Sequence, residues 1–431
     1  MNSKYDLNEL IDTIIKESDL SIPVKYHLKK IKKKNTILIA FGKGAISMAN
    51  GAIEILDNKI QGGVIVIPKG SKRPKLNSLE IIESSHPIPD QNSIKAGEAV
   101  IEWSKASSTK ESVIFLVSGG GSALVEKPLE GITLDDIIEL NKTLLNSGLN
   151  ISEINTIRKH VSQIKGGRLA EYAYPSNIYG FYASDVPGDS IDQIASGPTV
   201  PDPTTFEDAL KIINNNNLKD VIPKNIIKIL YEGVKGSIKD TPKPGDIKLK
   251  KANNKIIATN EKILKAVSAK LKKKGYKTII LTSRLEGESR EVGYALASIT
   301  LDVINKNIPV KPPLALILGG ETSVTVKGNG KGGRNLELAL AWGIKINYWQ
   351  IPKEKNASLL AFATDGIDGP TDCAGAIISS QDLDRIKELG VNAVKELNNN
   401  NSYYVLDRIN ALIKTGQTGS NLNNIIVIAI N

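Results

Sequence analysis

The sequence predicts an α/β fold with two domains, each a three-layer arrangement of helices around a sheet. Short apolar runs alternate with amphipathic stretches along the chain, which is the pattern of strands followed by helices. The 431 residues are too many for one ordinary hydrophobic core. A hydrophobic content of 41% with 24% charged residues is typical of a globular protein. In such a fold we expect functional groups at the carboxyl ends of strands.

The first domain is expected to span residues 1–240. Residues 5–34 are predicted to form helices that cap this domain. Apolar runs predict strands at 36–41, 63–68, 79–83, 113–117 and 178–183. Helices are predicted at 46–57, 93–105, 133–146 and 151–170, and over 205–231 with a turn at 214–217. The glycines Gly166 and Gly167 argue against one continuous helix over 151–170.

The second domain is expected to span residues 241–431, after a proline-, glycine- and lysine-rich linker at 233–251. It repeats the alternation of strands and helices. Strands are predicted at 255–259, 277–282, 314–318, 323–327, 359–363 and 425–430. Helices are predicted to begin at Asn260 and to cover 286–305, 336–344 and most of 381–413.

Composition excludes several classes of protein. The single cysteine, Cys373, excludes an internal disulfide and fits a reducing cytosol. With three histidines and one cysteine, a zinc site is not expected. No apolar run approaches the roughly 20 residues that span a bilayer, and the mixed-charge N-terminus does not resemble a signal peptide. We therefore expect a cytoplasmic protein with no membrane partner.

The net charge of +10 is concentrated in lysine-rich runs at 25–34 and 270–277. A nucleic-acid surface would use such runs. Each run contains one aromatic residue, Tyr26 or Tyr276, which is too few for a base-stacking platform. We therefore expect no nucleic-acid partner, and a basic balance also suits an enzyme that gathers anionic substrates.

One glycine turn is the centre of the predicted site. The predicted strand at 113–117 ends at Ser118, Gly119, Gly120, Gly121 and Ser122. Consecutive glycines permit positive φ and leave backbone N–H groups bare, so such a turn can hold a phosphate. The alternative is a tight turn that only closes the strand. The segment matches neither of the two common nucleotide-binding glycine motifs.

Two cationic residues lie at the starts of predicted helices. Lys43 lies between Gly42 and Gly44 after the first strand, and Arg334 follows the glycine-rich segment 328–333. The mobile Lys43 ammonium and the partial positive charge of the helix start are together well placed for an anion. At Arg334 the cation opposes the helix dipole, so an anionic partner would explain its placement. The alternatives are an ordinary turn lysine and a solvated loop arginine. His86, in the proline-rich loop 85–90, could also face a site, although a histidine bonded inside a rigid turn is the favoured interpretation.

Other charged loops are more ambiguous. Lys165 and Arg168 flank Gly166-Gly167 and could clamp a carboxylate or phosphate, although an ordinary charged helix face is the slightly favoured interpretation of the pattern. Asp185 and Asp189 follow the strand at 178–183, where Mg²⁺ is often met, but aspartates also form turns, and the spacing does not decide between the two. The acidic loop after the strand at 359–363 does not have the spacing of an EF-hand.

Taken together, nine stretches between Gly42 and Asn424 resemble the glycerate 2-kinase family, whose C-terminal half is called the MOFRL domain. They are GKGAISMA, HPIPD, LVSGGGSAL, EINTIRKHVSQIKGGRLA, SDVPGDSIDQIASGPTVPDPTTF, LEGESREV, GGETSVTVKGNGKGGRNLELAL, ATDGIDGPTDCAGA and TGQTGSNLNN. The resemblance implies ATP-dependent phosphorylation of D-glycerate at its 2-hydroxyl group, with Mg²⁺. It also implies an N-terminal Rossmann-like domain and a smaller MOFRL domain, with catalysis in the cleft between them.

The resemblance places the family's catalytic lysine and arginine on Lys43 and Arg334, which also become substrate-binding candidates. The remaining roles are hypotheses. Ser118–Ser122 and Asn260 would bind ATP, Asp189 would hold Mg²⁺ or accept the hydroxyl proton, and Lys165 and Arg168 would bind the glycerate carboxylate. The cleft candidates from the second domain are Glu321, Thr364, Asp365 and Asp368.

Three other functions stay open. The first is an NAD(P)-dependent hydroxypyruvate reductase, although Gly42-Lys43-Gly44 lacks the third glycine and a clear ribose-binding acid of a dinucleotide site. The second is a nucleotide- or nucleic-acid-binding protein without enzymatic activity. The third is a kinase for another hydroxy acid or for the 3-hydroxyl group. A homodimer is a possible assembly.

Overall fold

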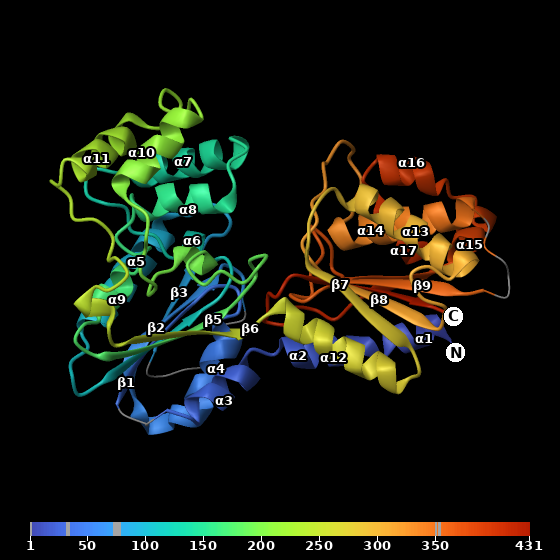
Figure 1. Cartoon of the computed structure of the whole chain (residues 1–431), viewed down its shortest axis with the longest axis horizontal. Coiled ribbons are helices and arrows are strands. Elements are labelled where there is room, and N and C mark those ends of the chain that lie inside the picture. The colour runs from blue at the N-terminus through green and yellow to red at the C-terminus, as the bar shows by residue number, and fades with distance from the viewer. Residues whose placement is uncertain (1, 32–34, 72–78, 350, 352–354) are drawn as a thin grey trace. The chain divides into compact units, whose positions relative to one another are not determined.

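The computed structural model describes residues 2–31, 35–71, 79–349, 351 and 355–431. The chain forms two compact units (Figure 1). The N-terminal unit is Leu20–Ala258, and the C-terminal unit combines Met1–Asp19 with Thr259–Asn431. The division therefore falls after residue 258, where we expected it at 240. The strand at 252–258 explains the difference, because it completes the sheet of the N-terminal unit.

The N-terminal unit contains a six-stranded parallel sheet in the order β3-β2-β1-β4-β5-β6. The strands are β1 (Thr36–Phe41), β2 (Ile60–Pro68), β3 (Glu80–Ser84), β4 (Ser112–Val117), β5 (Asn177–Ala183) and β6 (Ala252–Ala258). Every residue of β1 and β4 is buried, as expected of central strands covered on both faces. Because the strand order reverses between β1 and β4, a crevice is expected at their carboxyl ends.

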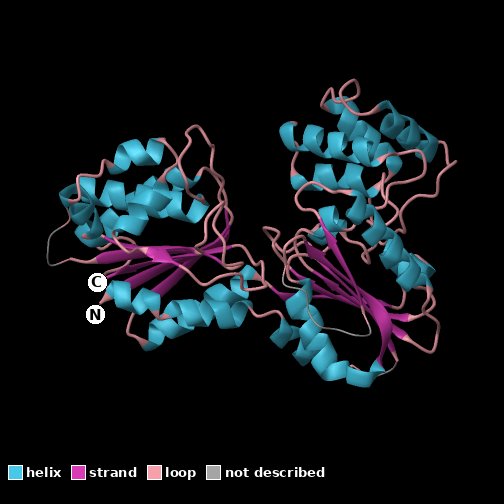
Figure 2. Ribbon diagram, turned by 180° about the vertical axis from the view of Figure 1, so that it is seen from behind, coloured by secondary structure: helices cyan, strands magenta, loops and turns pink. Residues whose placement is uncertain are grey.

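Helices cover both faces of this sheet (Figure 2). They are α3 (Ser21–Leu28), α4 (Ala45–Leu56), α5 (Gln91–Lys105), α6 (Gly121–Leu124), α7 (Leu134–Asn146), α8 (Ile151–Lys159), α9 (Arg168–Tyr172), α10 (Phe206–Asn215) and α11 (Lys224–Val234). Helices α7, α8, α10 and α11 enclose a second apolar core of their own. The predicted helix at 151–170 is interrupted, because Gly166 and Gly167 adopt φ values of 62° and 86°.

The C-terminal unit contains a mixed six-stranded sheet in the order β11-β10-β9-β12-β8-β7. The strands are β7 (Lys277–Leu285), β8 (Leu314–Gly320), β9 (Ala357–Ala363), β10 (Gly375–Ser379), β11 (Leu412–Ile413) and β12 (Asn424–Ile430). Only the β7–β8 pair is parallel among these described strands, and the other neighbours are antiparallel. Strand β12 lies in the middle of the sheet, between β8 and β9.

Helices again form layers on both faces of the second sheet (Figures 1 and 2). One layer contains α1 (Ser3–Asn8), α2 (Leu10–Ser18) and α12 (Asn260–Lys273). The other contains α13 (Ser289–Lys306), α14 (Arg334–Tyr348), α15 (Asp382–Glu388), α16 (Ala393–Asn398) and α17 (Ser402–Arg408). The buried Trp342 of α14 lies in the main core of this unit, and its indole N–H donates to Thr300 at 3.1 Å. The predicted α/β class with two three-layer domains is confirmed.

Two local predictions differ from the structure. Residues 323–327 alternate like a strand but form a loop, in which Ser323 makes a single bridge to Glu288. The Glu288 carboxylate accepts the Thr325 N–H at 3.0 Å, which takes the place of a strand partner. Helices α1 and α2, expected over the first domain, belong to the C-terminal unit, where α2 packs on α12. In the described part of the chain, no helix has both the length and the apolar character needed to cross a bilayer.

Candidate active site

The turn after β1 and the turn after β4 are bonded to each other at the point where the strand order reverses. The Lys43 N–H donates to the Gly119 carbonyl at 2.9 Å, and the Gly44 N–H donates to Ser118 Oγ at 2.9 Å. Gly42 has a φ of 117°, and a Cβ there would overlap Ser118. Glycine at this position therefore allows the two turns to approach.

The glycine turn itself has the features of an anion site. Gly120 adopts a φ of 81° and leads into the short helix α6. Among the described residues, the backbone N–H groups of Gly119 and Gly120 have no hydrogen-bond partner. Unpaired N–H groups in a turn with positive φ can form a concave nest for a phosphate. The predicted phosphate turn therefore has suitable backbone geometry.

Lys43 adds a cation to this turn. Its side chain is half-buried, and among the described residues its ammonium group has neither an ion pair nor a hydrogen bond. A Cβ added to Gly120 would lie 3.4 Å from Lys43 Cγ, so the lysine stem runs beside the turn. A half-buried ammonium with no acidic partner is well placed to meet an anionic ligand.

A series of hydrogen-bonded polar side chains contacts the glycine turn, and sequence reasoning missed it. Ser122 Oγ lies 3.0 Å from Ser196 Oγ, which donates to Asn155 Oδ1 at 2.8 Å. Ser196 and its neighbour Ala195 adopt φ values of 60° and 49°, which are strained for residues other than glycine. Because Ser122 and Ser196 are 74 residues apart in sequence, no local pattern could have paired them.

Asp189 lies in the loop after β5, the strand next to β4. Its backbone has a φ of 56°, and its half-buried carboxylate has no partner in the part of the chain that the structure describes. A neighbouring residue, Asp192, is anchored by Lys159 at 3.2 Å. No group of three or more His, Cys, Asp or Glu residues that could hold a metal is found among the described residues. One carboxylate still suits Mg²⁺ that is otherwise held by nucleotide phosphates and water.

Lys165 and Arg168 lie in the interior of the N-terminal unit. Lys165 is 2% exposed and forms an ion pair with Glu126, which also accepts a hydrogen bond from Ser162. Arg168 is 7% exposed and donates to the Lys239 carbonyl at 3.1 Å. Burial lowers the pKa of both side chains. Lys165 therefore has the contacts of a structural group, whereas the buried Arg168 Nε has no partner within the described structure.

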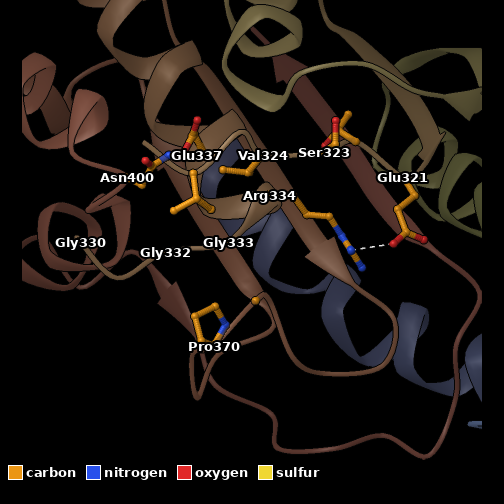
Figure 3. Close-up of a pocket in the computed structure, with 13 residues that line it drawn as sticks. Glu321, Ser323, Val324, Gly330, Gly332, Gly333, Arg334, Glu337, Pro370 and Asn400 are labelled. Atoms are coloured by element: carbon orange, nitrogen blue, oxygen red, sulfur yellow. Dashed lines mark hydrogen bonds and ion pairs between the residues drawn. The ribbon is translucent and has the colours of Figure 1, made fainter. Parts of the chain in front are cut away.

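The C-terminal unit contains a pocket of about 500 Å³ beside the start of α14 (Figure 3). Arg334, the first residue of α14, lies at one end, and its Nη1 forms an ion pair with Glu321 Oε1 at 2.6 Å. Within the described structure, the buried Arg334 Nε has no partner. The pocket is lined by Glu321, Thr322, Ser323, Val324, Val326, Gly330, Gly332, Gly333, Arg334, Glu337, Gly369, Pro370 and Asn400.

Polar groups elsewhere in this pocket are already bonded. Glu337 is 1% exposed and accepts from Arg290 Nε at 2.9 Å and from Asn400 Nδ2 at 3.1 Å. Asn400 Oδ1 accepts the N–H groups of Lys327 and Gly328. The bonding capacity left for a ligand is therefore concentrated at the Arg334 end. Sequence reasoning missed Glu337 and Asn400 because they are 63 residues apart.

Three of the predicted cleft residues hold the backbone together instead of lining the pocket. Asp368 accepts the Leu336 N–H at 2.9 Å and the Asn335 N–H at 3.1 Å, so it caps α14. Its burial raises the pKa of the carboxyl group. Thr364 Oγ1 donates to the Asn423 carbonyl at 2.7 Å. Asp365 accepts the N–H two residues ahead, at 3.1 Å. Of the four cleft candidates, Glu321 alone is among the pocket residues given above.

Asn260, the predicted ATP-binding residue outside the glycine turn, is 6% exposed. It belongs to the C-terminal unit, whereas Ser118–Ser122 belong to the N-terminal unit. Its Nδ2 donates to the carbonyls of Leu422 and Asn424 at 2.8 and 3.1 Å. The side chain therefore connects the start of α12 to the segment that enters β12.

Two family models match the chain. Residues 4–231 match a domain of unknown function, DUF4147, and residues 314–424 match the MOFRL family. The first match covers strands β1 to β5 and the glycine turn of the N-terminal unit, and it ends within α11. The second covers β8, the Arg334 pocket and the segment leading to β12.

Named relatives match over nearly the whole chain. A D-glycerate 2-kinase from Thermotoga maritima is 41% identical, with 98% of each chain covered. A putative hydroxypyruvate reductase from Agrobacterium vitis is 35% identical, covering 100% of this chain and 95% of the relative. A crystal structure of glycerate kinase from Thermotoga maritima superposes with a TM-score of 0.89 at 40% identity, covering 99% of each chain.

Proposed function

This chain belongs to the glycerate 2-kinase family, and we propose that it transfers the terminal phosphoryl group of ATP to the 2-hydroxyl group of D-glycerate. The products are 2-phospho-D-glycerate and ADP. One observation carries the proposal beyond family membership. At the reversal of strand order, the Lys43 ammonium group lies beside the N–H groups of Gly119 and Gly120, and none of these groups has a partner among the residues that the structure describes.

The proposed reaction needs charge neutralisation more than covalent chemistry. A bond forms between the 2-hydroxyl oxygen and the γ-phosphorus, while the bond from that phosphorus to the bridging oxygen of ADP breaks. Lys43 and Arg334 stabilise the negative charge on the phosphoryl group in transit. The backbone of Ser118–Ser122 holds phosphate oxygens of ATP.

Asp189 is proposed to serve the nucleotide's metal ion or the hydroxyl proton. Its half-buried carboxylate, which has no partner within the described part of the chain, suits either role, because both need an oxygen that is not engaged by the protein. Mg²⁺, when bound, would neutralise charge on the phosphates. Substituting Asp189 by asparagine and titrating with Mn²⁺ separates the two roles. If Asp189 is a metal ligand, the variant should need a higher metal concentration for activity. If Asp189 is the proton acceptor, the variant should have a lower kcat even at saturating metal.

For the glycerate carboxylate, we favour Lys43 and Arg334 over Lys165 and Arg168. The Lys165 ammonium is already paired with the buried Glu126. The Arg168 guanidinium is buried and donates to a backbone carbonyl. Extracting Lys165 toward a ligand would leave the buried Glu126 carboxylate without its cation, which is costly. We also propose a cytoplasmic enzyme, since its one cysteine, Cys373, is buried and unpaired.

The decisive experiment is product analysis. The purified chain is incubated with D-glycerate, ATP and Mg²⁺, and the product is detected with enolase. Enolase consumes 2-phosphoglycerate directly, whereas 3-phosphoglycerate requires a mutase first. A signal without mutase supports the proposal. A signal that depends on mutase would show that the 3-hydroxyl group, and not the 2-hydroxyl group, is phosphorylated.

A hydroxypyruvate reductase is the second candidate, because one relative carries that name and because the 3-2-1-4-5-6 sheet order is shared with dinucleotide-binding folds. The turn after β1 lacks the third glycine of the dinucleotide motif. Strand β2, whose end would supply a ribose-binding acid, ends at Pro68 and is followed by Lys69. Hydroxypyruvate-dependent oxidation of NADH or NADPH, with no phosphorylated product, would establish this alternative.

A further inference from the structure

His86 lies against the glycine turn, in the loop that follows β3. A Cβ added to Gly120 would lie 3.0 Å from His86 Cδ2 and 3.2 Å from His86 Nε2. The ring edge that carries Nε2 therefore faces the turn. The same added atom would lie 3.4 Å from Lys43 Cγ, so the loops after β3, β1 and β4 meet at this point.

The loop that carries His86 is held at both ends. Asp90 accepts from Ser85 Oγ at 3.0 Å and from the Ser93 N–H at 3.0 Å, and it thereby closes the loop and caps α5. Lys69 forms an ion pair with the same carboxylate at 2.6 Å. Side chains on loops with fixed ends are presented in a defined place, which a binding group requires.

His86 is exposed, and among the described residues neither ring nitrogen has a hydrogen-bond partner. Although His86 is exposed as a residue, its ring is partly desolvated where it lies against the glycine turn, and this desolvation, together with the neighbouring Lys43 ammonium, lowers the pKa of His86 to about 4. At neutral pH the ring is therefore uncharged, with one N–H donor and one free lone pair. An uncharged imidazole N–H can donate to the same anion as Lys43 without repelling the lysine ammonium.

We propose that His86 contacts the nucleotide, donating a hydrogen bond from Nε2 to an oxygen of the phosphate chain bound over Gly119 and Gly120. This proposal rests on the proposed function for the identity of the ligand. It adds a side-chain donor to the backbone N–H groups and to Lys43. Three strand ends would then supply one anion site: β1 through Lys43, β4 through the glycine turn, and β3 through His86.

Histidine NMR can observe the contact directly, because the full chain contains three histidines. His160 is buried and bonded to Asp240 at 3.0 Å, and His27 lines a different pocket with Tyr179 and Phe181. The full-length protein is labelled with ¹³C-histidine, and the His86 signal is assigned with His86→Gln. Titration with Mg²⁺ and a non-hydrolysable ATP analogue should shift the His86 signal saturably and leave the other two nearly unchanged.

Kinetics of matched variants gives an independent test. His86→Phe keeps an aromatic ring but removes the donor, and it should raise the KM for ATP about tenfold, in line with a hydrogen bond to a charged group. The KM for D-glycerate should not change. His86→Gln retains an N–H donor and should recover part of the loss. His27→Phe is the control and should leave both constants at the wild-type values.

The outcomes separate this contact from the proposed function. If calorimetry shows that the wild-type chain binds the ATP analogue while the His86 signal stays in place, the contact is wrong and the kinase proposal is untouched. An unchanged KM for ATP in His86→Phe would also overturn it. If the wild-type chain binds no nucleotide at all, the proposed function fails, and this contact fails with it.

Discussion

Lys43 and Arg334 share an unusual position, since each is a cation beside the start of a helix whose dipole opposes it. The unfavourable interaction of each cation with the helix dipole is explained if each residue binds an anion during turnover. We predict that Lys43→Ala and Arg334→Ala each lower kcat on the order of 10²-fold or more, because transition-state charge loses its counterion. Enolase-coupled steady-state kinetics measures the effect.

Stability should barely change in these two variants. Lys43 has no partner among the described residues, and the Arg334–Glu321 pair is partly exposed, so its loss costs at most about 1 kcal/mol. Lys95→Ala on α5 and Arg408→Ala on α17 are matched controls, because both side chains are exposed and outside the described site. Near-normal turnover in Lys43→Ala or Arg334→Ala would contradict the assignment.

Sequence reasoning can select candidate residues whose chemistry is encoded locally. The glycine turn, Lys43 and Arg334 became candidates because each follows a strand end or a glycine-rich segment with a few residues of the right kind. Lys165 and Arg168 could not be interpreted in that way. Their structural partners, Glu126 and the Lys239 carbonyl, are 39 and 71 residues distant in the chain. No local pattern distinguishes a buried cation with a remote partner from a ligand-binding one.

At the scale of elements, the glycine turn depends on Gly120. Its φ of 81° is unfavourable for alanine, and an added Cβ would lie close to His86. We predict that Gly120→Ala lowers the unfolding free energy by about 1 kcal/mol and also raises the KM for ATP at least several-fold, because the turn that we propose binds phosphate must rearrange. Urea unfolding and steady-state kinetics measure the two effects.

Gly148 provides the matched control for this change. It has a φ of 75°, and nothing lies within 4 Å of the Cβ that alanine would add. Gly148→Ala should therefore carry the same conformational cost while the kinetic constants stay at the wild-type values. Equal effects of the two substitutions on KM would show that the turn at Gly120 has no special role.

Helix α14, which carries Arg334, depends on its cap, Asp368. Removing that carboxylate in Asp368→Ala leaves the buried N–H groups of Asn335 and Leu336 without an acceptor. We predict a loss of about 1–3 kcal/mol in unfolding free energy, measured by urea denaturation. Asp365→Ala, in the same loop, removes a single turn bond and should cost less. A loss no larger than that of the control would contradict the capping role.

The pH dependence of stability tests the same group separately. Burial raises the pKa of Asp368 above its ordinary value of 3.8, so the folded chain binds this proton more tightly than the unfolded chain. The resulting stabilisation is fully present below pH 3.8 and is lost as the pH rises through the folded-state pKa. Asp368→Asn cannot titrate. Its unfolding free energy, relative to wild type, should therefore rise with pH across that window, and a constant difference would contradict the prediction.

At the scale of the whole molecule, apolar periodicity predicted the layers well and the division between units less well. Central strands such as β4 and β8 are continuous apolar runs, and these were recognisable because both of their faces are buried. The two-residue strand β11 has no such signal. Amphipathic helices such as α2 show in sequence that one face is buried, but the pattern does not say against which sheet it packs.

The assignment of residues 1–19 to the C-terminal unit yields the last prediction. Leu10 of α2 is fully buried, and α2 packs on α12. Leu10→Ala should lower the stability of the C-terminal unit by about 2–5 kcal/mol. Hydrogen exchange of the full chain should therefore accelerate in β8, β9 and β12 and remain unchanged in β1 and β4. Leu56→Ala, in the core of the N-terminal unit, should give the opposite pattern. If hydrogen exchange in Leu10→Ala became faster in β1 and β4 instead, helices α1 and α2 would belong to the N-terminal unit, as the sequence alone had predicted.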